Sequence, residues 1–216
     1  MTRPTDIMRR RLLVAGAAFA VIGRSPSGAA APPIPTPRQT AGPFFPRVLP
    51  ADTDWNLIQV EGQSGGAAGT PIGVTGRLLS TEGQPIGGVG IEIWQCDALG
   101  RYHYPGPQDG ADPRFQGYGR VTTDQEGRYR FRTIRPVPYS GRAPHVHFAV
   151  TPPGRARFTT QMYIAGAPEN EADPLWSRLR NPADRAALTI DLRPSANAGE
   201  EQLAGVFDLV LASTGD

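Results

Sequence analysis

Short runs of alternating apolar and polar residues recur along the chain, which is the pattern of half-buried β-strands. Between residues 89 and 95, three apolar residues (Val, Ile, Ile) are separated by Gly, Glu and Trp. A similar alternation marks residues 144–151. Because successive side chains of a strand point to opposite faces, each run predicts a strand with one face in the core. The same pattern predicts further strands at residues 74–79, 118–123, 128–134, 158–164 and 205–212.

Turn-forming residues separate these runs and indicate how the strands connect. Residues 82–85 (Glu-Gly-Gln-Pro) and 124–127 (Asp-Gln-Glu-Gly) are typical of hairpin turns. Helix is expected only as a turn or two at residues 174–180 and 182–188. Short strands with Gly- and Pro-containing turns predict an all-β fold for residues 73–216, an antiparallel β-sandwich with long loops.

Residues 32–72 lack this alternation and form a separate region of the sequence. Seven prolines fall between residues 32 and 50, where they exclude a regular helix or a central strand. Two adjacent aromatic residues in this stretch, Phe44 and Phe45, are expected to pack against the rest of the protein. Three glycines at positions 65, 66 and 69 then mark a flexible loop. The sequence therefore predicts an extended, proline-rich N-terminal arm followed by a loop.

The first segment, residues 1–31, has the composition of an export signal. Arginines at positions 9 to 11 precede an uncharged apolar run, 12–22, that is too short to span a bilayer. Alanines at positions 29 to 31 offer a cleavage point, and the arginines resemble a twin-arginine signal, which a receptor reads. We therefore expect an exported protein, periplasmic or extracellular, without stable membrane association after processing. An uncleaved membrane tether is the alternative.

Charge and composition exclude several classes of partner and chemistry. The whole chain carries a formal charge of +2 and residues 1–31 carry +4, so the remainder carries −2. The basic character thus belongs to the export signal and gives no reason to expect nucleic-acid binding. The chain has no lysine, which excludes Schiff-base chemistry at a lysine. A single cysteine, Cys96, excludes an internal disulfide and is expected to be a small buried residue.

Two of the three histidines lie two residues apart in one of the expected strands. His145 and His147 would share one face of that strand, while Val146, Phe148 and Val150 face the core. Residues i and i+2 of a strand are about 6.5–7 Å apart, a spacing that suits two imidazole ligands of one metal ion. A pair of ordinary strand histidines is the alternative that this pattern leaves open.

Two tyrosines are candidates to join these histidines. Tyr102 follows an expected strand into a glycine-containing loop, and Tyr139 lies in a loop that two prolines stiffen. Tyr104 is a rival of Tyr102, because residues i and i+2 share a face in an extended loop. Tyr129 and Tyr163 lie within expected strands and are interpreted as structural.

The mixture of donors indicates which metal fits. A phenol has a pKa of about 10 and ionises at neutral pH only beside a strong Lewis acid. Two phenolate oxygens with two imidazole nitrogens favour ferric over ferrous iron, because anionic ligands stabilise the higher charge. Zinc prefers histidine, cysteine and carboxylate ligands, and blue copper needs a cysteine. An oxygenase that binds copper or Fe(II) through the two histidines stays open as an alternative.

Several motifs together give the chain a family resemblance. They are TAGPFF at 40–45, EIWQ at 92–95, GRY at 100–102, TIRPVPY at 133–139, RAPHVHF at 142–148 and TQMY at 160–163. Each alone is weak, but together they are specific. With them, residues 36–212 resemble the intradiol ring-cleavage dioxygenases, and most of all the iron-bearing β-type chain of protocatechuate 3,4-dioxygenase.

The resemblance implies a ferric site and a reaction. The four Fe(III) ligands of the family match Tyr102, Tyr139, His145 and His147. The implied reaction cleaves a catechol-type aromatic between its two hydroxyls with O₂ and gives a cis,cis-muconate-type diacid. A small aromatic diol and O₂ are thus the expected partners, and the oligomeric state is left open. A non-catalytic, transthyretin-like sandwich that binds a small aromatic or a partner is the alternative.

Two further residues match family positions, and one segment departs from the family. Arg142 matches an arginine that positions and polarises the bound catecholate, and Gln161 a glutamine that lines the pocket. Tyr139 matches the labile tyrosinate, which the catechol displaces and which accepts a proton. Only five residues separate Tyr139 from His145, whereas β-type chains have a longer, aromatic-containing insertion that packs over the substrate. We therefore expect a more open pocket, which weakens the case for protocatechuate as the substrate.

Overall fold

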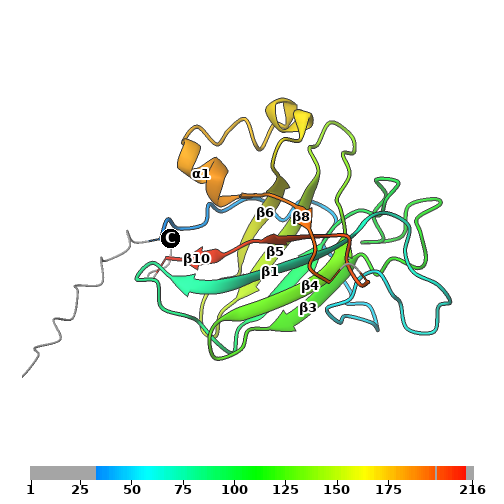
Figure 1. Ribbon diagram of the computed structural model, residues 1–216, viewed down its shortest axis with the longest axis horizontal. Coiled ribbons are helices and arrows are strands. Elements are labelled where there is room, and N and C mark those ends of the chain that lie inside the picture. The colour runs from blue at the N-terminus through cyan, green and yellow to red at the C-terminus, as the bar shows by residue number, and fades with distance from the viewer. Residues whose placement is uncertain (1–32, 198, 213–216) are drawn as a thin grey trace, which may run out of the picture. The chain divides into compact units, whose positions relative to one another are not determined.

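The computed structural model describes residues 33–197 and 199–212, which lie in one compact unit (Figure 1). The expected export signal, residues 1–31, lies outside the described residues. Residues 33–50 contain no helix or strand. Two backbone hydrogen bonds of 2.9 Å, from Thr36 N–H to Val210 O and from Gln39 N–H to Thr159 O, hold this segment against a strand of each sheet.

Strands make up most of the regular structure of the described residues. In chain order the elements are β1 (Pro71–Ser80), β2 (Gly90–Trp94), β3 (Tyr118–Thr122), β4 (Arg128–Ile134), β5 (His145–Thr151), β6 (Phe158–Ile164), the 3-10 helix η1 (Pro168–Ala172), α1 (Pro182–Ala187), β7 (Thr189–Ile190), β8 (Arg193–Pro194), β9 (Leu203–Val206) and β10 (Leu209–Leu211). Helix α1 falls in the second expected helical stretch, whereas residues 174–178 form turns without a regular helix.

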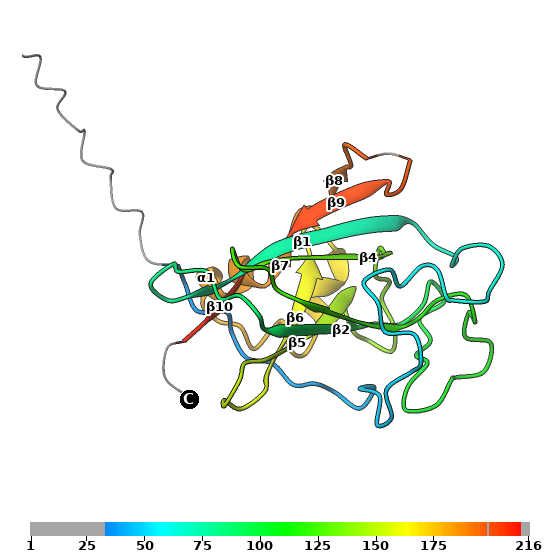
Figure 2. The same cartoon turned by 90° about the horizontal axis from the view of Figure 1, so that it is seen from below.

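The strands form two five-stranded sheets, which are seen as two layers in Figure 2. In the first sheet β1 pairs with β4, β9 and β10, and β8 pairs with β9. The second sheet has the order β3-β2-β5-β6-β7. Between the sheets, the ring of Phe148 lies 6.3 Å from that of Phe131 and 4.9 Å from that of Phe207. The fold is thus all-β and sandwich-like, with few helices.

The expectation of a purely antiparallel arrangement is wrong, because both sheets are mixed. β1 runs parallel to β9 and β10, and β6 runs parallel to β7. Alternation shows which side chains share a face, but it carries no sign of strand direction. Parallel neighbours need a long connection in place of a hairpin, and residues 81–202 provide it between β1 and β9.

The single strand expected at 205–212 is divided between β9 and β10. β9 pairs with β1 at Ile72–Thr75, and β10 pairs with it farther along, at Leu78–Ser80. Between these two pairings lies Asp208, which belongs to neither strand and whose carboxylate accepts the backbone N–H of Arg77 at 2.8 Å. The same stretch therefore supplies two short strands to one long neighbour.

Strand β5, which carries the two histidines, is buried on both faces. Val146, Phe148 and Val150 lie in the core between the sheets, as the alternation predicts. His145 and His147 point to the other face, and each is only 1% exposed. A smaller apolar cluster covers this second face. β5 therefore presents both imidazoles to a space from which the protein itself excludes most water.

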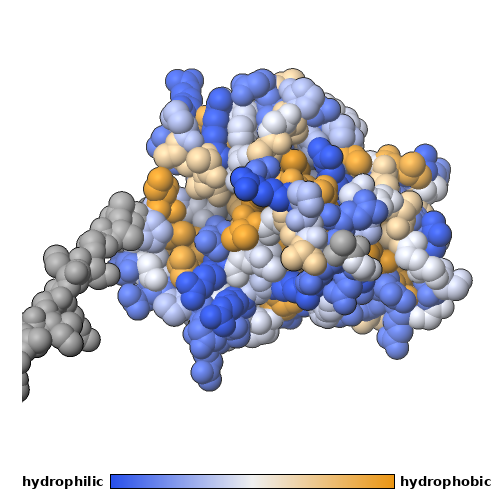
Figure 3. All heavy atoms as spheres, in the orientation of Figure 1, coloured by the Kyte–Doolittle hydropathy of each residue, from blue (hydrophilic) through white to orange (hydrophobic). Residues whose placement is uncertain are grey.

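The surface shows no extended apolar band on the face seen in Figure 3, where apolar side chains lie in small groups between hydrophilic ones. Over residues 33–197 and 199–212, no helix has both the length and the apolar character needed to cross a membrane.

Candidate metal centre

Three separate segments of the chain bring four candidate residues together. His145 and His147 lie on β5, Tyr102 lies in the loop after β2, and Tyr139 lies in the loop after β4. Their ring centroids are 5.2 Å apart for Tyr102 and Tyr139, and 5.5 Å apart for Tyr139 and His145. In the remaining two pairs, the ring centroids are 4.8 Å apart for His145 and His147 and 6.3 Å apart for His147 and Tyr102. The four rings thus surround a common point.

The Nε2 atoms of the two imidazoles face each other. His145 Nδ1 lies 2.6 Å from the carbonyl oxygen of Ala143. Since a carbonyl only accepts, Nδ1–H is the donor and the lone pair of His145 is on Nε2. This atom lies 3.2 Å from His147 Nε2. Two nitrogens bound to one ion at about 2.0–2.1 Å, with a bond angle of about 90–110°, are about 2.8–3.4 Å apart, so the separation fits a shared metal ion.

Packing fixes the ring of His147. The indole of Trp94 is parallel to it, with centroids 4.8 Å apart and 4° between the planes. On another side, a Cβ placed on Gly42 would lie 3.4 Å from His147 Cε1, so the backbone of segment 33–50 approaches the ring closely. His147 Nδ1 is buried and has no hydrogen-bond partner among the described residues. Metal-binding histidines usually donate this second N–H to a partner; here ring stacking orients the imidazole.

Tyr102 is held by its loop and by a stacked ring. The Asp97 carboxylate accepts the backbone N–H groups of Leu99 and Arg101 at 2.8 and 3.0 Å, which closes the turn before Tyr102. Phe44 stacks on the phenol ring with centroids 4.1 Å apart. The Tyr102 hydroxyl is buried without a hydrogen-bond partner in the described part of the chain. Leaving such a group unpaired is costly, and a cation at the common point would be its partner.

A two-residue turn places Tyr139 beside Arg142. The backbone N–H of Arg142 donates to Tyr139 O at 2.8 Å, and Tyr139 N–H donates to Arg142 O at 3.3 Å. Between them, Ser140 and Gly141 have φ angles of 45° and 75°, both positive as in a type I′ turn. The short segment noted in the sequence is thus a minimal hairpin whose tip is exposed. Tyr139 itself is half-buried, in contrast to Tyr102.

Burial keeps all four groups neutral in the absence of a cation. Burial, together with the positive charge of Arg142, lowers the pKa of His145 to about 4. Burial and the two neighbours His145 and Arg142 lower the pKa of His147. Burial raises the pKa of Tyr102, an effect to which nearby Tyr139 adds, and it also raises the pKa of Tyr139. Neutral imidazoles have the lone pairs that metal binding needs, and phenols at this depth ionise only next to a cation.

The expected substrate-binding pair lies next to these rings. Arg142 Nη2 donates to Gln161 Oε1 at 2.6 Å. Strand pairing places Gln161 directly opposite His147. The Gln161 amide also donates from Nε2 to Thr40 O at 3.0 Å, which determines that its oxygen faces Arg142. Segment 33–50 therefore helps to orient the glutamine.

Two residues of this network were not predicted as site residues: Asp173 was not singled out, and Tyr163 was interpreted as structural. Asp173 accepts from Arg142 Nε at 2.8 Å through Oδ2. Tyr163, interpreted as structural, places its hydroxyl 3.3 Å from Gln161 Oε1. Asp before Pro is a typical turn start, so the pair at 173–174 signals a carboxylate that binds backbone N–H groups. Nothing in the sequence links that carboxylate to Arg142, because the contact is purely tertiary.

Other polar residues near this centre are engaged elsewhere. The hydroxyl of Tyr104, the rival of Tyr102, donates to Gln116 O at 3.2 Å. Cys96 is 1% exposed, as expected for a small buried residue, and burial raises the pKa of its thiol to about 12. Within the described ranges, no group of three or more His, Cys, Asp or Glu side chains could hold a metal ion. The two imidazoles therefore have phenols, and no cluster of carboxylates, as their companions.

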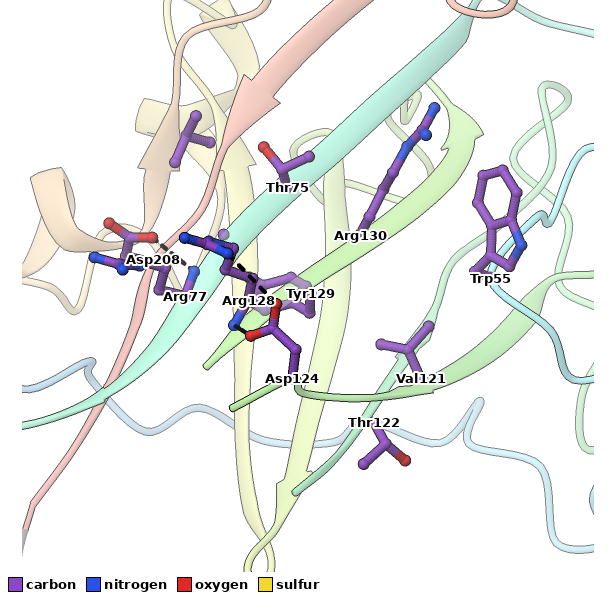
Figure 4. Close-up of a pocket in the computed structure, with 12 residues that line it drawn as sticks. Trp55, Thr75, Arg77, Val121, Thr122, Asp124, Arg128, Tyr129, Arg130 and Asp208 are labelled. Atoms are coloured by element: carbon purple, nitrogen blue, oxygen red, sulfur yellow. Dashed lines mark hydrogen bonds and ion pairs between the residues drawn. The ribbon is translucent and has the colours of Figure 1, made fainter. Parts of the chain in front are cut away.

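A cavity of about 680 Å³ lies over β1, β3 and β4, and Figure 4 shows the residues around it. None of the six candidate residues lines it. Two of its arginines are already paired with carboxylates, Arg128 with Asp124 at 3.8 Å and Arg130 with Glu201 at 2.7 Å. The candidate chemistry is thus at the four rings and not in this cavity.

Comparison with known proteins agrees with the geometry. The family model described as "Dioxygenase" matches residues 40–213. The protocatechuate 3,4-dioxygenase beta chain of Burkholderia cepacia is 36% identical over 171 residues, which cover 73% of this chain and 71% of that protein. The chain belongs to the intradiol ring-cleavage dioxygenases.

Other relatives of this intradiol dioxygenase differ in length. Catechol 1,2-dioxygenase of Candida albicans is 34% identical over 122 residues, which cover 48% of this chain but only 40% of that protein. Among solved structures, the dioxygenase domain of a dioxygenase–carbohydrate-binding protein fusion from Streptomyces sp. SirexAA-E is similar, with a TM-score of 0.64 and 31% identity. That match covers 84% of this chain and 100% of the other.

Proposed function

We propose that this dioxygenase binds one Fe(III) ion through Tyr102, Tyr139, His145 and His147 and cleaves a catechol-type aromatic between its two hydroxyls. O₂ supplies the two oxygen atoms that are added, and the product is a cis,cis-muconate-type diacid. The closed arrangement of two phenols and two imidazoles around one point carries the proposal. Two hard anionic donors with two nitrogen donors suit trivalent iron better than zinc or copper.

The chain's own residues supply proton transfer and charge stabilisation. Bound Fe(III) would act as a Lewis acid that binds and orients the catecholate. Tyr139 would accept a proton from a catechol hydroxyl at its phenolic oxygen, because it is half-buried beside a turn while Tyr102 is enclosed. Arg142, of which Nε and Nη2 are held, would present its third nitrogen, Nη1, to the negative charge on the substrate.

Iron content, colour and oxygen uptake together test this proposal. Protein purified without chelators is expected to contain iron, to be red-brown from tyrosinate-to-Fe(III) charge transfer, and to consume O₂ with catechol. Colourless protein that consumes O₂ would instead favour a copper or Fe(II) site that uses the two histidines. Iron-free protein without oxygen uptake would favour a binding sandwich without turnover.

We further propose that the pocket discriminates weakly between ring substituents. The exposed two-residue turn after Tyr139 consists of Ser140 and Gly141 and has no aromatic side chain that could pack over the substrate ring. One methylene more or less in a closely packed hydrophobic pocket changes kcat/KM by about 10–200-fold, and a more open pocket lacks such contacts. We expect kcat/KM for catechol, hydroxyquinol and protocatechuate to agree within about tenfold. Oxygen-electrode rates with the three substrates measure this, and a preference above a hundredfold would contradict it.

Export by the twin-arginine route is also a proposal, since it rests on the sequence of residues 1–31 alone. Replacing the arginines at 9, 10 and 11 by lysine keeps the charge but removes the pair that the receptor reads. We expect the protein to move from the exported to the cytoplasmic fraction of a bacterial host. Lysine at Arg3 and Arg24, in the same segment, is the control. Unchanged export of the triple variant would exclude this route.

A further inference from the structure

We propose that Asp173 is a positioning residue that orients both the substrate-binding Arg142 and the metal-binding His145. The inference rests on the proposed function and adds a residue to it. Asp173 follows η1, outside the strands that carry the candidate ligands, and its side chain is fully buried. Its role follows from four hydrogen bonds that converge on one carboxylate.

The carboxylate of Asp173 uses both oxygens. Oδ1 accepts the backbone N–H groups of Leu175 and Trp176 at 2.8 and 3.0 Å, which fixes the carboxylate to its own loop. Oδ2 accepts Arg142 Nε and the backbone N–H of Ala143, both at 2.8 Å. Oδ1 therefore fixes the position of the carboxylate, and Oδ2 binds two consecutive residues of the segment that leads into β5.

The first consequence concerns the plane of the Arg142 guanidinium. Asp173 holds Nε, and Gln161 Oε1 holds Nη2 at 2.6 Å, so the planar group is held along one edge. A planar fork held at two points cannot rotate about its long axis. The third nitrogen, Nη1, is then presented in one fixed direction. Orientation of this kind is worth more to a reaction than charge alone, because the group need not reorganise when the substrate's charge develops.

The second consequence concerns His145. Asp173 holds the N–H of Ala143, and the carbonyl of the same residue accepts His145 Nδ1–H at 2.6 Å. Both polar backbone groups of Ala143 are thus engaged, one by the carboxylate and one by the imidazole. Asp173 therefore reaches the metal ligand through a single intervening residue. Partners that orient a metal-binding histidine typically change metal affinity by about 10–100-fold when they are removed.

Asparagine is the most informative replacement for Asp173. It has nearly the same shape, but only one of its two terminal atoms can accept hydrogen bonds. Whichever way its amide turns, the NH₂ group faces two N–H donors. We expect Asp173→Asn to weaken anaerobic catechol binding about tenfold or more, and to speed removal of iron by a chelator about tenfold. The control is Glu201→Gln, since Glu201 is a buried carboxylate paired with Arg130 at 2.7 Å in the other sheet. It should leave both readouts unchanged.

A double-mutant cycle with Arg142→Met separates positioning from a general structural effect. If Asp173 acts on the substrate through Arg142, Asp173→Asn should change catechol affinity by less than twofold when Arg142 is already Met. In the Arg142→Met protein, Asp173→Asn should still speed the loss of iron, because Asp173 contacts Ala143, which in turn orients His145. Equal losses of catechol affinity in both backgrounds, or wild-type behaviour of Asp173→Asn, would overturn the inference.

If Asp173→Asn does not fold, Arg142→Lys provides the test. Lysine keeps the positive charge but lacks the planar fork that Asp173 and Gln161 hold. Catechol binding should weaken about tenfold while the rate of iron removal stays at the wild-type value; wild-type affinity would overturn the inference. Failure of the proposed function is distinguishable, because it would appear in the unmodified protein as absent iron and absent catechol binding.

Discussion

Replacing His147 by alanine is expected to remove bound iron and ring cleavage together. The side chain is 1% exposed, and its Nε2 lies 3.2 Å from that of His145, so it would supply one of four donors to a single ion. Loss of a group that only orients a ligand already costs about 10–100-fold in metal affinity, and loss of the ligand itself should cost more. Iron analysis after gel filtration, with oxygen uptake on catechol, measures both effects.

The third histidine gives a matched control for this experiment. His103 is partly buried but faces Phe115, with ring centroids 6.2 Å apart, and does not belong to the four rings. His103→Ala should therefore keep iron and activity. Circular dichroism of His147→Ala should confirm that the fold survives, because the side chain also packs on Trp94. A folded His147→Ala protein with full iron content would exclude His147 as a ligand.

Replacing Tyr139 by phenylalanine is expected to separate iron binding from catalysis. Tyr139 is half-buried on an exposed turn, so loss of its oxygen should leave the other three donors in place. The protein should retain iron, lose part of its visible absorption and lose about 10²–10⁴-fold in kcat, the usual contribution of a proton acceptor. Absorption spectra and steady-state rates on one preparation measure the two effects separately.

Tyr102→Phe should behave differently, although it makes the same chemical change. Tyr102 is 1% exposed and its ring stacks on Phe44, so the phenylalanine should pack in place while the buried oxygen is lost. We expect iron and activity to fall together in that variant. Tyr104→Phe is the control, because the Tyr104 hydroxyl already donates to Gln116 O. If Tyr104→Phe instead released the iron, the assignment of the two tyrosines would be reversed.

The alternation of residues was enough to predict most strands, and it failed where direction and pairing matter. β4 and β6 coincide with the expected runs 128–134 and 158–164. In β4, buried residues alternate with more exposed ones and leave a direct period-2 trace, whereas β6 is buried along nearly its whole length. The parallel pairing of β1 with β9 and β10 leaves no such trace. A strand looks the same in sequence whichever way its neighbour runs, so the mixed sheets could not be read from the pattern.

The sequence likewise predicted some residues of the candidate centre and missed others. The motifs around His145 and His147, together with the resemblance they support, pointed to the four rings that the fold brings together. They did not point to Asp173, which is 31 residues from Arg142 and has no signal beyond its own turn. A motif specifies residue types at a given spacing along the chain. It does not specify which distant carboxylate will contact Arg142 after folding.

By itself, the sequence determined the candidate donor residues, the strand that carries the two imidazoles, and the family to which the chain belongs. Local chemistry and local periodicity suffice for these, because they depend on residue identity and on neighbours one or two positions away. The tertiary structure alone decided which way Gln161 turns its amide and which carboxylate holds Arg142. These depend on contacts between distant segments, which form only when both sheets and segment 33–50 are packed together.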